Sequence, residues 1–274
     1  CNLSDGLVPV EINENTKPEK SKALWSCSMM TRWLSEECID VPPQQVICGS
    51  GFLDIPLKDE RMHVKIDPHS GASEEGLLFM TIGLDISSRM TLAARVKAEG
   101  EWEQKLLALN EFHPFGGERR LVHWKQESSQ AWKCPVEIRE ALRDARPGGK
   151  GVRLVLATPA LFQHGWRANW LKPINGKLEG CPPGSSVTLR LVSACIERWK
   201  PISGWNLENG KVGPKALKRL VPAGSTYFFE IVQGDAGELA EQLWLHSVSD
   251  EAQDRRDGFG LALWGIWTGN EGRQ

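Results

Sequence analysis

The chain has 274 residues, which allows one large domain or two of ordinary size, and we expect two. Its 33 basic and 35 acidic residues give a formal net charge of -2. This balance excludes a global field that would draw the whole protein onto nucleic acid or a membrane, so any polyanion site must be a local basic patch.

The cysteines predict neither a disulfide framework nor a zinc site, because the seven residues are odd in number and form no C-x-x-C pair. Free thiols are typical of a reducing compartment, and we expect a cytoplasmic protein. No apolar run approaches the roughly 20 residues of a membrane span. The chain opens with Cys1 and has no signal-peptide pattern, so we interpret it as beginning partway into a longer protein.

In the first half, residues 1–20 predict a loop, and apolar residues at helical spacing predict a helix over Lys22–Leu34. Alternating apolar residues then predict strands over 62–66, 77–84 and 92–98. We expect Met62, Val64 and Ile66 to be half-buried.

The segment FHPFGGERRLVHW combines a sharp turn with basic residues. Gly116 and Gly117 permit the turn, and Arg119 and Arg120 project from the start of the strand that follows. Guanidinium groups suit phosphate recognition because they offer paired donors and a stackable plane. A hairpin with a solvated Glu-Arg pair is the alternative.

A helix opened by Pro135 ends before Pro147, and we place the domain boundary there, between 1–147 and 148–274. The second half predicts strands over 152–158, 187–196, 225–232 and 261–267, with a helix capped by Asp235 after the third. This order fits the second half of a βαββαβ ferredoxin-like unit, although its first crossover helix is not evident.

A long polar connection after 196 interleaves indoles with cations, which is typical of a surface that tracks a single nucleic-acid strand. Its candidate RNA-binding residues are Trp205, Lys211, Lys215, Lys218 and Arg219. The three lysines share one face if the segment is helical, whereas a solvated charged loop is the alternative.

The C-terminal run DRRDGFGLALWGIW places Gly258 and Gly260 just before a strand, with Arg255 and Arg256 beside them. Glycines there let backbone N–H groups approach a ligand, and the arginines indicate an anionic one. Dinucleotide and P-loop motifs are excluded, because both require the glycines to follow a strand and precede a helix. A tight loop with Phe259 in the core is the alternative.

Catalytic motifs of the G-x-S-x-G, H-E-x-x-H and EF-hand types do not occur in the sequence. We therefore expect no enzyme activity by those routes, no cofactor and no metal site.

Six segments in order resemble one family, the third subunit of the Cmr complex, which belongs to the RAMP superfamily and its Cas-five group. They are ERMHVKIDPHSGASEEGLLF, FGGERRLV, LATPALFQHGW, ISGWNL, RLVPAGSTYFFEI and DRRDGFGLALWGIW. The resemblance implies an α+β protein with two ferredoxin-like (RAMP/RRM-like) domains, the first lacking its N-terminal part. It assigns the glycine loop to Gly258, Phe259, Gly260 and Gly265, and the GGERR turn to residues 116–120.

The implied function is a non-catalytic RNA-binding subunit of the type III-B CRISPR (Cmr) effector, which serves antiviral defence. Such a subunit binds the 5′ tag of crRNA and caps the foot of the complex. Its implied partners are crRNA, a Cas-ten-type large subunit and a backbone RAMP subunit, with no membrane. The alternatives are a purely structural subunit and a metal-independent RAMP endoribonuclease, for which Tyr227, His113 and His246 are the candidate acid and bases.

Overall fold

The computed structural model describes residues 6–10, 24–35, 51–53, 55–86, 91–116, 120–127, 132–207, 210 and 212–268. It is a mixed α/β structure with many strands and few helices. The chain divides into two compact units, of which the first combines Cys1–Leu53 with Ala131–Gln274 and the second is Asp54–Gln130.

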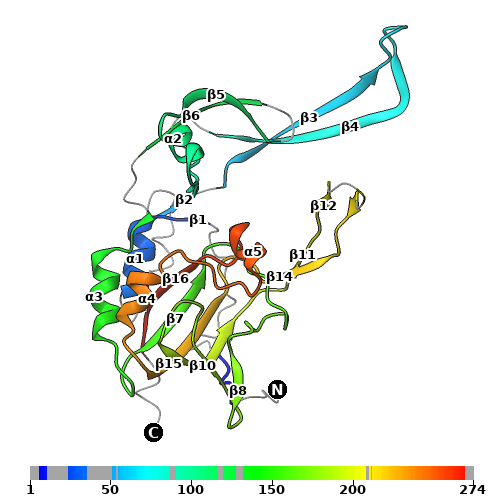
Figure 1. Ribbon diagram of the computed structural model, residues 1–274. Helices are drawn as coiled ribbons and strands as arrows, with labels where there is room; N and C mark the ends of the chain where they lie inside the picture. Colours follow the sequence, from blue (N-terminus) through cyan, green and yellow to red (C-terminus); the bar gives the residue numbers. More distant parts are fainter. Residues whose placement is uncertain are drawn as a thin grey trace. The chain divides into compact units, whose positions relative to one another are not determined.

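The first unit is built on a six-stranded antiparallel sheet with the order β16-β7-β15-β10-β9-β8 (Figure 1). Its strands are β7 (Gly151–Leu156), β8 (Lys172–Ile174), β9 (Lys177–Gly180), β10 (Thr188–Cys195), β15 (Thr226–Gln233) and β16 (Ala262–Trp267). The four long predicted strands are therefore confirmed. Numbered one to four along the chain, these four strands lie across the sheet in the order four, one, three, two.

The connection between β7 and β10 contains no helix, and all of its residues are described. The connection between β15 and β16 contains α4 (Gly237–Gln242) and α5 (Ala252–Arg256). The Asp235 carboxylate accepts a 2.9 Å hydrogen bond from the N–H of Gly237, which satisfies one free donor at the start of α4.

The central strand β7 is buried along its whole length, as its GVRLVL sequence predicts. Leu154 of β7, Phe229 of β15 and Trp264 of β16 are each at most 2% exposed and belong to one apolar core. Because both faces of β7 are covered, its charged residue Arg153 needs a specific partner.

Helix α1 (Cys27–Ser35) supplies that partner and packs against β16. The Arg153 guanidinium lies 4.2 Å from the ring centroid of Trp33 and donates to the Trp33 carbonyl. Next to it, a Cβ at Gly265 would lie 2.5 Å from the carbonyl oxygen of Leu34. Gly265, which the family resemblance assigns to the glycine loop, thus makes room for α1. The predicted helix is shorter than expected, because Leu24–Trp25 form β1 and pair with β2 (Phe52–Leu53).

Helix α3 (Val136–Asp144) shows why the units do not follow the predicted boundary between 147 and 148. Its Ile138 and Leu142 are fully buried, and the helix packs against α1, α4 and β16 (Figure 1). The apolar face of α3 therefore joins it to α1 and to the sheet that follows it, within the first unit.

The polar connection after β10 forms two short antiparallel ribbons that extend away from the sheet (Figure 1). They pair β11 (Lys200–Ile202) with β14 (Lys218–Leu220), and β12 (Trp205–Asn206) with β13 (Gly213–Pro214). We call residues 199–220 the arm. The segment is not helical at Lys215 and Lys218, so the condition for a shared lysine face is not met there, and Lys211 lies outside the described residues.

The second unit contains two hairpins and one short helix among its described residues. They are β3 (Leu57–Ile66) with β4 (Ser73–Asp85), β5 (Asn110–Phe115) with β6 (Arg120–Lys125), and α2 (Glu101–Leu107). The strand predicted over 92–98 is wrong, because these residues have no regular structure and nearly all are exposed. Two separate hairpins do not confirm a ferredoxin-like sheet here.

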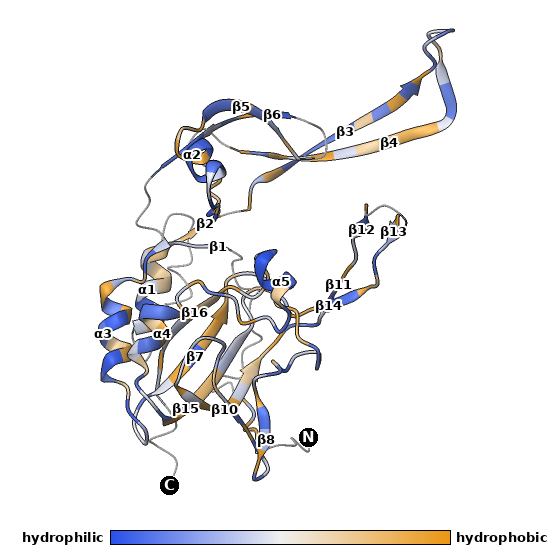
Figure 2. Ribbon diagram, in the orientation of Figure 1, coloured by the Kyte–Doolittle hydropathy of each residue, from blue (hydrophilic) through white to orange (hydrophobic). Residues whose placement is uncertain are grey.

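The β3–β4 hairpin has one apolar face. Cross-strand pairs such as Met62 with Met80 and Val64 with Leu78 share a face, because side chains alternate along a strand. We call the six large side chains on this face the hairpin strip: Met62, Val64, Leu78, Met80, Ile82 and Leu84. All are exposed, and Figure 2 shows hydrophobic residues along much of β4. The expected half-burial of Met62, Val64 and Ile66 is therefore wrong, because all three side chains are exposed.

The contact between Gly265 and α1 predicts a stability change. Gly265→Ala should lower the free energy of unfolding by about 1–3 kcal/mol, because the new methyl group overlaps a backbone carbonyl. Urea unfolding followed by circular dichroism measures this. Gly213→Ala is the matched control, because its Cβ meets no atom within 4 Å. Equal stability of the two variants would contradict the packing role.

Candidate nucleic-acid interface

The first two glycines of the glycine loop, Gly258 and Gly260, lie between α5 and β16, and at both positions the backbone conformation requires glycine. Gly258 and Gly260 have φ values of 82° and 77°, a region that L-residues rarely adopt. A Cβ at Gly260 would lie 2.9 Å from the backbone nitrogen of Ser249, whereas one at Gly258 would meet nothing within 4 Å. Gly260 is therefore packed against the protein, and Gly258 leaves an open surface.

The N–H groups of this loop are used inside the protein. They donate at 2.8–3.3 Å from Gly258 to the carbonyl of Arg255, from Phe259 to that of Asp254, and from Gly260 to that of Pro159. In this structure these N–H groups are therefore not free for an anionic ligand, and RNA binding by the loop stays a prediction. Phe259 is partly buried and does not belong to the apolar core, so the core position that the tight-loop alternative gave it is not confirmed.

The Thr158 hydroxyl fastens the loop to the residues that follow β7. It donates to the Gly258 carbonyl at 2.7 Å and accepts from the Leu261 N–H at 2.9 Å. One side chain thus satisfies a backbone acceptor and a backbone donor on either side of Gly260, and it fixes the path from α5 into β16.

The two arginines of α5 differ in their availability. Arg255 donates through Nη1 to the carbonyls of Ser249 at 2.9 Å and Asp250 at 2.5 Å. Arg256 is exposed and has no hydrogen-bond or ion-pair partner among the described residues. The geometry therefore leaves Arg256 free for an external anion and gives Arg255 a structural role.

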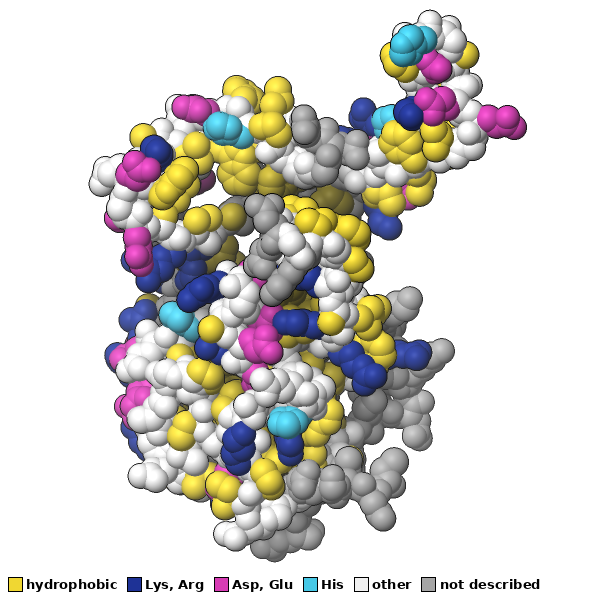
Figure 3. Space-filling model, turned by 45° about the vertical axis from the view of Figure 1, so that its right-hand side comes forward, with side chains coloured by type: hydrophobic (Ala, Val, Ile, Leu, Met, Phe, Trp, Pro, Cys, Tyr) yellow, Lys and Arg dark blue, Asp and Glu magenta, His cyan; other side chains and the backbone are white. Residues whose placement is uncertain are grey.

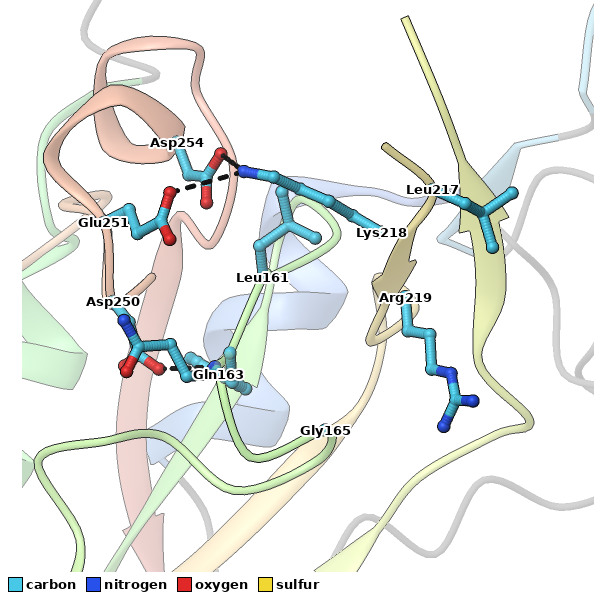
Figure 4. A pocket seen from close by; sticks show the side chains of 10 residues that line it. Leu161, Gln163, Gly165, Leu217, Lys218, Arg219, Asp250, Glu251 and Asp254 are labelled. Atoms are coloured by element: carbon cyan, nitrogen blue, oxygen red, sulfur yellow. Dashed lines mark hydrogen bonds and ion pairs between the residues drawn. The ribbon is translucent and has the colours of Figure 1, made fainter. Parts of the chain in front are cut away.

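Lys218 is an anchor between the arm and α5. Its Nζ lies 2.8 Å from Asp254 Oδ1 and 3.4 Å from Glu251 Oε2 (Figure 4). The hydrogen bond to Asp254, whose side chain is only 8% exposed, raises the pKa of Lys218 above its ordinary value. Lys218 was predicted to contact RNA, but in this structure carboxylates already neutralise it.

Arg219 points away from those carboxylates in Figure 4 and belongs to the exposed part of the arm. Its guanidinium carbon lies 4.9 Å from the ring centroid of Trp199, so cation and indole are stacked. Trp205 is 59% exposed, and Lys215 is also exposed. The arm therefore carries the mixture of indoles and cations that the sequence predicted, on a ribbon.

An open groove of about 390 Å³ lies beside the base of the arm. Sequence reasoning missed it, although three acidic residues close together at 250–254 were a signal for pairing with the arm's cations. The lining residues come from the segment after β7, from β14 and the residue before it, and from α5 and the two residues before it: Leu161, Phe162, Gln163, Gly165, Leu217, Lys218, Arg219, Asp250, Glu251 and Asp254. Figure 3 shows acidic side chains with lysine and arginine side chains next to them on this unit.

In the second unit, Arg120 is an internal bridge. Its Nη1 lies 2.9 Å from Asp59 Oδ2, and its guanidinium covers Gly83 of β4. Hydrogen bonds from Arg61 and Arg120 hold the pKa of Asp59 below its ordinary value. The prediction of a free phosphate-binding fork is therefore wrong for Arg120, which instead joins the two hairpins.

The GGERR turn itself is only partly described. Gly116 has a φ of 80° and open space around it, as a sharp turn requires. Gly117 and Arg119 lie outside the described residues.

The structure describes all three candidate catalytic residues. Tyr227 is 3% exposed and donates to the carbonyl of Trp166 at 2.7 Å, and burial raises its pKa. His113 lies 3.2 Å from Glu111 in the second unit, whereas His246 is exposed in the first.

Among the described residues, no cluster of three His, Cys, Asp or Glu side chains is suited to a metal. The helices of the described part are all too short or too polar to cross a membrane.

The comparison with protein families identifies the chain. Residues 3–267 match the family described as CRISPR-associated protein (Cas_Cmr3), so the chain is a CRISPR-associated protein. Because the match covers nearly its whole length, the chain belongs to the Cas_Cmr3 family. A search of curated proteins found no match.

One solved structure is also similar, described as "Cryo-EM structure of the Type III-B Cmr-beta bound to cognate target RNA". The identity is 14% and the TM-score 0.33, over 64% of this chain and 45% of that one. The chain thus spans less than half of that solved chain, and a similarity at this level carries no argument.

The loop geometry predicts a role for Thr158 in stability. Thr158→Val should lower the free energy of unfolding by about 1–3 kcal/mol, because it leaves the Gly258 carbonyl and the Leu261 N–H without their partner. Thermal unfolding measures the loss. Thr158→Ser keeps the hydroxyl and should retain most of the stability, and an equal loss in both variants would disprove the hydrogen-bonding explanation.

Proposed function

We propose that this chain is a non-catalytic RNA-binding subunit of a type III-B CRISPR (Cmr) effector complex. It binds the 5′ tag of crRNA and caps the foot of the complex, in the cytoplasm, as part of antiviral defence. Membership of the Cas_Cmr3 family supports the assignment to CRISPR. The antiparallel order of β16, β7, β15 and β10 supports a ferredoxin-like unit that lacks its first crossover helix.

The observation that carries the RNA-binding proposal is the stacked, exposed pair of Arg219 and Trp199 on the arm. Single-stranded RNA is held by cations that contact its phosphates and by planar groups that stack on its unpaired bases. Lys200, Lys215 and Trp205 add exposed groups of both kinds to the same arm. Local charge of this sort binds RNA even though the net charge of the chain is -2.

The non-catalytic part of the proposal is supported by Tyr227. An RNA-cleaving RAMP enzyme needs an acid and a base beside a ribose 2′-OH, and the only tyrosine is buried in the core with its hydroxyl bonded to a carbonyl. Cleavage of labelled repeat RNA by the purified protein in EDTA would contradict this part.

The hairpin strip supports contact with the protein partners of the complex, a Cas-ten-type large subunit and a backbone RAMP subunit. Exposed apolar patches of this kind mark protein interfaces, and an isolated two-stranded hairpin is only marginally stable. The strip offers RNA little attraction, because its face carries one lysine, Lys58, which Glu60 on the same face offsets.

RNA binding is tested by the salt dependence of affinity. Replacing Lys215 and Arg256 together by Ala should weaken binding to tagged guide RNA. The slope of log affinity against log salt should become shallower by about 1.4, since each lost contact with single-stranded phosphate removes about 0.7. Fluorescence anisotropy from low to high salt measures both effects. Arg143→Ala is the control, because Arg143 pairs with Glu241 on the surface of the same unit. Unchanged affinity and slope in the double variant would count against the proposal.

The partner contact is tested by reconstitution with the other subunits. Leu78→Ser with Met80→Ser should reduce assembly at least ~10-fold, because it removes apolar area from the centre of the hairpin strip. Size-exclusion chromatography of the mixed subunits measures assembly. The control, Glu75→Ser with Asp85→Ser, changes exposed polar residues of the same hairpin and should assemble normally. Normal assembly of both variants would exclude the strip as an interface.

A further inference from the structure

The groove beside the arm has the size and lining of a site for one small planar ligand. Its volume of about 390 Å³ falls in the range of small-molecule clefts, about 300–1,000 Å³. Leu161 and Phe162 supply apolar surface and are 6% and 8% exposed. Figure 4 shows that its polar side chains come from both sides, from β14 and from the start of α5.

On the arm side, Arg219 is the cation available to a ligand. Lys218 is occupied by Asp254 and Glu251, whereas Arg219 has no anionic partner among the described residues. Trp199 supports the guanidinium at 4.9 Å. A planar guanidinium that is held in this way is a suitable stacking surface for a nucleobase.

On the other side, Glu251 is the carboxylate available to a ligand. Asp250 already accepts hydrogen bonds of 2.8 Å from the N–H groups of Gln163 and Asn169. Asp254 is nearly buried and holds Lys218. Glu251 is 52% exposed and shares only the longer, 3.4 Å contact with Lys218, so its carboxylate has free acceptor positions.

The charge of the groove selects a base over a bare phosphate. Its lining contains three carboxylates and two cations, and one of those cations is already paired. A phosphate would meet net negative charge, whereas an amino group on a base edge would donate to Glu251. Adenine, cytosine and guanine carry such a group, and uracil does not.

We propose that the groove binds one unstacked, amino-bearing nucleobase of the crRNA tag. The base stacks on Arg219 and donates its exocyclic amino group to Glu251. This inference rests on the proposed function and adds to it a site that reads one position of the tag.

The test uses the full chain and a set of tag RNAs in which each adenine in turn is replaced by purine riboside, which lacks only the amino group. At one position, the loss of that group should weaken binding to the unchanged protein by about 3–10-fold. Glu251→Ala should remove the difference between adenine and purine riboside at that position alone. Glu241→Ala, which removes an exposed carboxylate of the same unit, is the matched control and should keep it. If the selected base is cytosine or guanine, the corresponding deamino analogues replace purine riboside.

Arg219→Lys tests the stacking separately, because it keeps the charge and removes the plane. An abasic residue at the selected position should weaken binding to the unchanged protein more than binding to this variant, which keeps only the hydrogen bond to Glu251, and the salt dependence should stay the same. Thermal unfolding confirms that the variants are folded. Salt-dependent tag binding without amino-group dependence at any position would overturn the inference and leave the proposed function standing. Absence of tag binding by the unchanged protein would overturn both.

Discussion

The side chain of Thr158 is the contact on which the candidate interface depends. It bridges both ends of the turn at Gly260, immediately after the central strand β7. With the turn fixed, α5 is fixed as well, and its Asp254 and Glu251 hold Lys218 of the arm. A chain of short polar contacts thus runs from the most buried strand of the sheet to an exposed ribbon. The glycines serve this framework, because only they permit the turn that Thr158 closes.

Basic residues near one another in sequence have different roles in the folded chain. Arg255 satisfies backbone carbonyls, and its neighbour Arg256 does not. Lys218 neutralises two carboxylates, and its neighbour Arg219 stacks on an indole. In each pair, one cation stabilises the fold and the other stays available, so a basic cluster in sequence overstates the charge that a ligand meets.

The sequence was sufficient for the four long strands of the first unit, because each shows either a continuous apolar run, as in β7 and β16, or a clear apolar alternation, as in β10. It was insufficient for the arm, whose strands of two or three residues are too short to show a period. It also missed the partners of Lys218 and Arg120, which lie 36 and 61 positions away in the chain. Such pairings depend on the tertiary fold, and local patterns do not encode them. For the same reason, the sequence did not indicate that helix α3 belongs to the same compact unit as the sheet that follows it.

The packing of α1 against β16 has a consequence for folding during synthesis. Residues 27–35 and 262–267 meet through Leu34 and Gly265, although most of the chain separates them. Contacts between such distant segments slow folding, because a long loop must close before any of them forms. While a ribosome makes the chain, α1 can meet α3 early, but it cannot pack against β16 until nearly the whole chain has been synthesised. Until then, the part of α1 around Leu34 that Gly265 accommodates lacks that partner.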